Sequence, residues 1–360
     1  ADGPMDTIPK YDVSIDVYNR TSDISIKDSR SYYIYSSVPD KLRDTWAWDK
    51  KIFIKGDKTA PHVFIDGVNI KMSPSSKGPA IELNKKASAY LYFIGKDSSL
   101  QGADGRAAIQ KNRSEGQLYV LARTGTTVTC KGGDKAAGIG GSYATRNISN
   151  GYYNGDMYGH GVNMHFGSQS NPDYWGGTIA AIGGNGGAGI GGGKEGSGDV
   201  TIEGNTEVNA AGGTGGAGIG GGYGAKNNSN STGNQITIRS NENGSPTVNA
   251  VGGGTKKGIA DIGGAGIGTG CNSNADTTIT LEGKVTIKAT AGKGNVAIGT
   301  NGNEQVFTGL AGGTSITRKD SDKNDIPPLP GDNVPTPSGG DTAGGGSTDG
   351  GSAGGGSTGG

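Results

Sequence analysis

Apolar and polar residues alternate along this chain in stretches that are only a few residues long. Examples are "VFIDGVNI" at 63–70, "VTIEGNTEV" at 200–208 and "ITLEGKVTI" at 279–287. A period of two is typical of β-strands, whereas an amphipathic helix repeats its apolar positions every 3.6 residues. Gly, Asn or Asp interrupts each stretch, so each one predicts two short strands around a turn.

A glycine-rich phrase with a central isoleucine recurs in phase with these strands. "GGAGIGGG" occurs at 186–193 and again at 215–222, with looser copies elsewhere. The aligned isoleucines are Ile81, Ile109, Ile139, Ile190, Ile219, Ile267 and Ile298. Their spacings are 28, 30, 51, 29, 48 and 31 residues. The phrase supplies a third strand, which predicts a repeat of about 29 residues that is extended by inserts at two places.

Strands that recur without helices between them must coil and stack. No helix fits between them, because each glycine would cost a helix about 1 kcal/mol. The prediction is an all-β fold, a right-handed parallel β-helix or solenoid, because such crossovers are right-handed. Each isoleucine should point inward and stack on the isoleucine of the next coil. The flanking glycines are expected at sharp turns with positive φ or where neighbouring coils touch.

Composition excludes several classes of function. Lys and Arg number 33, as do Asp and Glu, so we expect no nucleic-acid partner, which would need a basic face. No apolar run approaches 18 residues, so we expect no membrane insertion. Two glycine phrases match a dinucleotide fingerprint, but no helical segment follows either, so no cofactor is expected. Cys130 and Cys271 are 141 residues apart, several coils, and both should be free.

Changes in composition divide the chain into three parts. Residues 1–50 lack the glycine phrase and are predicted to form an N-terminal cap, since an open end would expose strand edges. Residues 51–318 are predicted to form the β-helix. Residues 319–360 are Pro-rich and then Gly/Ser-rich, and are predicted to form a disordered, flexible linker.

The repeat units resemble a known class of protein. "VTIEGNTEVNAAGGTGGAGIGGG" and "ITLEGKVTIKATAGKGNVAIGT" are similar to right-handed β-helix surface proteins of Gram-positive gut bacteria, of the carbohydrate-binding or adhesin type. The resemblance implies an extracellular, cell-surface location. It also implies a monomer tethered to the cell wall, and the linker composition suits such a tether.

The first insert, residues 142–177, differs from the rest of the chain in composition. It holds seven of the 22 aromatic residues and two of the three histidines. Large aromatic rings combined with Asn, Gly and Ser are typical of recognition loops. The alternative is that the loop folds over the coil and buries its own aromatics. The candidates for ring stacking are Tyr152, Tyr153, Tyr158, Tyr174 and Trp175, and those for hydrogen bonding are Asn154, Asp156 and His160.

These features predict a non-catalytic binding protein whose ligand is a glycan. The first alternative is a host-protein binder, with a host glycoprotein or an immunoglobulin as partner. The second is a polysaccharide-degrading lyase or hydrolase. Hydrolysis needs two carboxyl groups at a defined separation, and no pair recurs in register here. His160 and His165 have no evident third ligand, so no metal site is expected.

Overall fold

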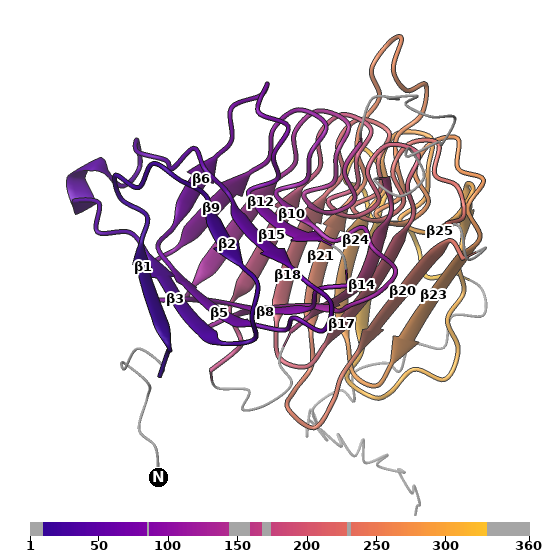
Figure 1. The fold of residues 1–360 in the computed structure, drawn as a ribbon. Coiled ribbons are helices and arrows are strands. Elements are labelled where there is room, and N and C mark those ends of the chain that lie inside the picture. The colour runs from indigo at the N-terminus through magenta and orange to yellow at the C-terminus, as the bar shows by residue number, and fades with distance from the viewer. Residues whose placement is uncertain (1–9, 85, 144–158, 168–173, 229–231, 330–360) are drawn as a thin grey trace, which may run out of the picture.

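The computed structural model describes residues 10–84, 86–143, 159–167, 174–228 and 232–329. Within them almost all regular structure is β-strand, arranged in three long sheets whose pairings are nearly all parallel (Figure 1). The sheets run side by side along the molecule, and chain position advances steadily from one end to the other. One short 3-10 helix, η1 (Asp40–Leu42), precedes β4.

The first sheet has nine strands in spatial order. They are β1 (Val13–Asp16), β3 (Ser31–Tyr35), β5 (His62–Asp66), β8 (Ala89–Ile94), β11 (Leu118–Ala122), β14 (Gly161–Phe166), β17 (Gly198–Glu203), β20 (Asn234–Arg239) and β23 (Thr277–Glu282).

The second sheet carries the isoleucine–glycine strands. They are β2 (Ile24–Ile26), β4 (Ile52–Lys55), β7 (Ile81–Asn84), β10 (Ile109–Gln110), β13 (Ile139–Gly140), β16 (Ile190–Gly191), β19 (Ile219–Gly220), β22 (Ile267–Gly268), β25 (Ile298–Thr300) and β26 (Asn303–Glu304), the last pairing antiparallel.

The third sheet faces the other two across the core. It consists of β6 (Asn69–Lys71), β9 (Ser98–Gln101), β12 (Thr127–Lys131), β15 (Thr178–Ile182), β18 (Glu207–Ala211), β21 (Thr247–Val251), β24 (Thr286–Thr290) and β27 (Ser315–Lys319).

The predicted isoleucine ladder is confirmed. Ile190 pairs with Ile219, Ile219 with Ile267, and Ile267 with Ile298, and all four are fully buried. Burying each side chain stabilises the fold by about 1.5–3 kcal/mol. The two cysteines are buried and free, as the spacing predicts.

The glycine beside each isoleucine makes this stacking possible. Gly191 has a φ of 135°, and a Cβ placed on it would lie 1.9 Å from the carbonyl oxygen of Gly220 on the next strand. Any side chain would therefore collide with the neighbouring backbone and also hold a conformation that L-residues rarely adopt.

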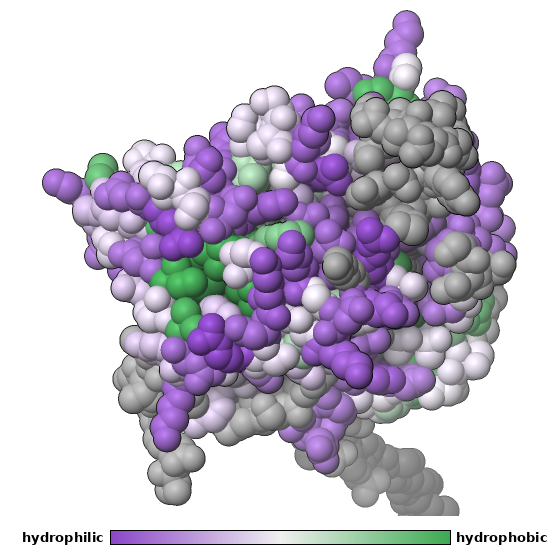
Figure 2. All heavy atoms as spheres, in the orientation of Figure 1, coloured by the Kyte–Doolittle hydropathy of each residue, from purple (hydrophilic) through white to green (hydrophobic). Residues whose placement is uncertain are grey.

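The N-terminal residues join the sheets instead of forming a separate cap. β1 pairs with β3, β2 pairs with β4, and Trp48 makes a parallel bridge to Ile70 of the third sheet. The predicted cap over 1–50 is therefore not what the described residues from 13 onward form. Val13 and Ile15 pack partly buried against the core. On the face shown in Figure 2, hydrophilic residues dominate, and apolar ones gather in a hollow toward this end.

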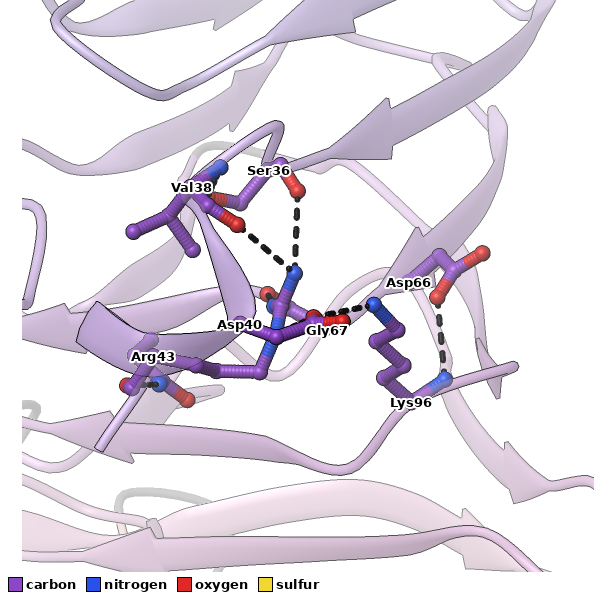
Figure 3. A network of polar contacts seen from close by, with 8 residues as sticks. Ser36, Val38, Asp40, Arg43, Asp66, Gly67 and Lys96 are labelled. Atoms are coloured by element: carbon purple, nitrogen blue, oxygen red, sulfur yellow. Dashed lines mark hydrogen bonds and ion pairs between the residues drawn. The ribbon is translucent and has the colours of Figure 1, made fainter.

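A polar network fastens the segment between β3 and β4 to two later turns (Figure 3). The Arg43 guanidinium donates to the carbonyl oxygen of Gly67 at 2.7 Å and to that of Ser36 at 3.2 Å. The Lys96 ammonium group donates to the Asp40 carboxylate at 2.7 Å. These contacts order a segment that lacks a strand of its own in the third sheet.

The C-terminal end is closed by a buried ion pair. The Arg318 guanidinium donates to the Glu304 carboxylate at 2.6 Å, and only 3% of the Arg318 side chain is exposed. Phe307 and Leu310 are buried in the same core. Ile326 also packs partly buried against this core, so the folded part continues past the predicted boundary at 319. Residues 330–360 of the predicted linker lie outside the described residues.

The insert at 142–177 contains a strand of the first sheet. Val162, Met164 and Phe166 of β14 are buried, and Met164 and Phe166 pair with residues of β17. The prediction of one surface loop over 142–177 is therefore wrong. β14 divides it into 142–160, which follows the second sheet, and 167–177, which precedes the third sheet.

Candidate ligand-binding corner

The predicted site residues separate into three groups. Tyr174 and Trp175 lie between β14 and β15, whereas His160 directly precedes β14. The other five predicted residues, Tyr152, Tyr153, Asn154, Asp156 and Tyr158, lie outside the described residues.

His160 is buried, with 4% of its surface exposed. Its Nδ1 accepts a hydrogen bond from the Ser197 amide at 3.1 Å and lies 3.0 Å from the Ser197 hydroxyl. The imidazole thus joins β14 to the next coil, and we withdraw it from the candidates for ligand hydrogen bonding.

The outer face of the first sheet carries a column of stacked rings. His62, Tyr90, Tyr119 and His165 are register partners on β5, β8, β11 and β14. Successive ring centroids are 4.5, 4.6 and 4.7 Å apart, with interplanar angles of 5° to 15°. The faces of these rings cover one another, so the column presents mainly ring edges to a ligand.

A second column runs beside the first. Phe64 and Tyr92 stack at 4.6 Å, and the Tyr92 hydroxyl lies 2.9 Å from Nδ1 of His62. Burial raises the pKa of Tyr92 to about 12 and lowers the pKa of His62. Burial also lowers the pKa of His165. Both imidazoles are therefore uncharged at neutral pH, which suits a closely stacked column.

Trp175 is the ring that departs from this stacking. Its centroid lies 5.1 Å from that of Tyr92, but the two planes are tilted by 48°. The Arg123 guanidinium carbon lies 6.0 Å from the indole centroid. Trp175 is only partly buried, so it offers an aromatic surface at the corner where the first sheet turns toward the third.

Polar side chains surround Trp175. The Thr124 hydroxyl accepts a hydrogen bond from the Gly176 amide at 3.0 Å, and the Thr124 amide donates to the Tyr174 carbonyl at 2.8 Å. A Cβ on Gly176 would lie 2.8 Å from the Asn205 amide nitrogen, so that side chain lies directly against the loop. We call Arg123, Thr124, Trp175 and Asn205 the Trp175 corner. An apolar ring flanked by amide, hydroxyl and guanidinium groups can bind the two faces of a sugar.

A titratable cluster also lies where β14 begins. Lys111 is 1% exposed, and its ammonium group donates to the carbonyl oxygens of Arg113 and Glu115. Burial lowers the pKa of Lys111 to about 8 and raises the pKa of Asp199, whose carboxylate accepts from the Asn163 amide at 3.2 Å. The contacts of Lys111 hold main-chain groups beside a β-bulge, and its burial keeps the amine from a substrate in solution.

The aromatic columns were missed in the sequence, although the signal is present there. His62, Tyr90 and Tyr119 are spaced by 28 and 29 residues, and Tyr33, Phe64 and Tyr92 by 31 and 28. These are the spacings of the isoleucine series. Aligning the aromatic residues on that period would have predicted both columns.

Comparisons with protein-family models, curated proteins and solved structures find no match for this chain. Within the described ranges, no group of three or more His, Cys, Asp or Glu side chains could hold a metal ion. No helix in the same ranges is long and apolar enough to cross a membrane.

Proposed function

We propose that this chain is a right-handed parallel β-helix of about 29 residues per coil that recognises a glycan without catalysis. In this proposal it is an extracellular protein, tethered to the cell wall as a monomer. The register supports the fold, because strands of one sheet pair with strands three positions later along most of the chain.

The Trp175 corner carries the functional proposal. A pyranose has an apolar C–H face that packs on an aromatic ring, and hydroxyls that bond to amides and hydroxyls. Trp175 supplies the ring, and Asn205 and Thr124 supply the polar groups beside it. Such a small contact predicts weak binding in which one or two aromatics account for most of the affinity.

A glycan array followed by titration of the retained sugars tests this proposal. Trp175→Ala should weaken binding about 10–100-fold, the effect of losing an aromatic hot spot. Trp46→Ala, which removes a ring packed on Tyr18 near the N-terminal end, is the matched control and should leave affinity unchanged. Unchanged affinity in Trp175→Ala, with the fold verified by circular dichroism, would exclude this corner.

A protein partner is the second candidate. Ile182 and Val251 are 40% and 44% exposed at the ends of β15 and β21, and Ala211 lies between them in the register. A flat sheet surface with exposed apolar residues favours a protein ligand, for which a host glycoprotein or an immunoglobulin is the proposed class. Ile182→Ser with Val251→Ser should then abolish an immunoglobulin pull-down that Trp175→Ala leaves intact.

A further inference from the structure

Two lysines and two tyrosines form a second cluster, away from the Trp175 corner. Lys135 and Lys194 lie on neighbouring coils, in the turns beside the second sheet, and the Lys194 amide donates to the Lys135 carbonyl at 2.9 Å. The Lys194 ammonium group lies 5.7 Å from the Tyr143 ring centroid and 5.6 Å from that of Tyr223. The Lys135 ammonium group lies 5.3 Å from the Tyr143 centroid.

The cluster is held in place by the fold. A Cβ on Gly186 would lie 3.4 Å from two carbons of the Lys194 side chain, so the lysine stem lies across that turn. The Tyr223 hydroxyl accepts a hydrogen bond from the Asn272 side-chain amide at 2.9 Å, and the Tyr223 main-chain amide donates to Gly186 at 2.8 Å. All four aromatic and basic side chains are half-buried.

The charge at this cluster is not balanced by the neighbouring acids. Within the described part of the chain, neither Lys135 nor Lys194 forms an ion pair. The adjacent Asp134 carboxylate accepts a hydrogen bond from Asn185 instead, at 3.2 Å, and Glu195 is exposed. Two ammonium groups thus share one tyrosine ring, and each such contact offsets only about 0.5–1 kcal/mol at an exposed site.

We infer that this cluster binds the anionic group of an acidic sugar, a carboxylate or a sulfate ester. An anion between the two ammonium groups would accept charge-assisted hydrogen bonds from both and remove their mutual repulsion. Tyr143 and Tyr223 would contact the ring that carries the charge. The inference rests on the proposed function only in taking the ligand to be a glycan, and it narrows that ligand to an acidic one.

Affinity electrophoresis tests the inference with two pairs of polymers. Polygalacturonate and its methyl ester differ in the carboxylate, and dextran sulfate and dextran differ in the sulfate. The variant Lys135→Gln/Lys194→Gln should lose at least tenfold in affinity for the acidic member of one pair or both. Lys41→Gln/Lys71→Gln removes the same charge from two exposed lysines elsewhere and should match the wild type.

The outcomes separate this inference from the proposed function. An equal loss in both double variants indicates general attraction and overturns the anion site. Retention of a neutral polymer without stronger retention of its acidic partner also overturns it, and leaves glycan binding intact. Acidic retention that depends on the lysines but not on Trp175 supports the anion site and refutes the Trp175 corner. No retention of any polymer, together with an empty glycan array, contradicts both.

Discussion

Replacing Gly191 by alanine tests the physical reason for the glycine phrase. The new methyl group would lie 1.9 Å from the Gly220 carbonyl oxygen and 2.9 Å from the Gly220 carbonyl carbon. Both atoms belong to the backbone of the next coil, so no side-chain rotation relieves the contact. Alanine would also have to adopt a φ of 135°.

The size of the effect follows from two terms. A residue held in a sparsely populated backbone region costs about 1–3 kcal/mol. Forcing extra carbon into a packed interior costs about 1–3 kcal/mol more. The lower entropy of the unfolded alanine chain offsets about 0.4–1 kcal/mol. We therefore expect Gly191→Ala to lower the free energy of unfolding by roughly 1–5 kcal/mol.

Urea unfolding followed by far-ultraviolet circular dichroism measures this effect. Gly254→Ala is the matched control, because a Cβ there meets no atom within 4 Å and its φ lies outside the positive range. The control should be neutral, or more stable by up to about 1 kcal/mol. If both variants unfold within about 0.5 kcal/mol of each other, the spread expected of a neutral surface change, the steric explanation of the repeat is refuted.

Two further predictions concern buried side chains. Ile219→Ala should lower the free energy of unfolding by about 2–5 kcal/mol and Ile219→Val by about 0.5–1.5, and equal losses in the same urea titration would contradict the ladder. Burial lowers the pKa of Lys111 from 10.5 to about 8, so between these pH values the unfolded chain holds more protons and stability rises with pH. The stability of the wild type relative to Lys111→Met should therefore increase from pH 8 to 10.5, and a difference that stays constant with pH would refute the shift.

The core could be predicted from the sequence because the repeat is written in residue types. Ile190 and Ile219 share both a spacing and a local phrase, and a buried inward position needs no other information. The alternation of Val162, Met164 and Phe166 within "GVNMHF" was also readable as a strand. It was overlooked because the composition of the surrounding insert favoured a loop.

The candidate site was less predictable, because it depends on contacts between distant residues. His160 is buried by Ser197, which lies 37 positions later on the next coil. Trp175 gains its surroundings from Tyr92 and Asn205, which lie on the preceding and the following coil. Composition can indicate that an aromatic residue is free to bind, but only the register shows which side chains lie beside it.

A crystal structure of the protein bound to its array-selected oligosaccharide tests the central claim most directly. Our account predicts that one sugar ring packs on the Trp175 indole, with its hydroxyls hydrogen-bonded to Asn205 or Thr124. A sugar bound on the third sheet near Ile182 and Val251, or against the ring edges of Tyr90 and Tyr119, would contradict it.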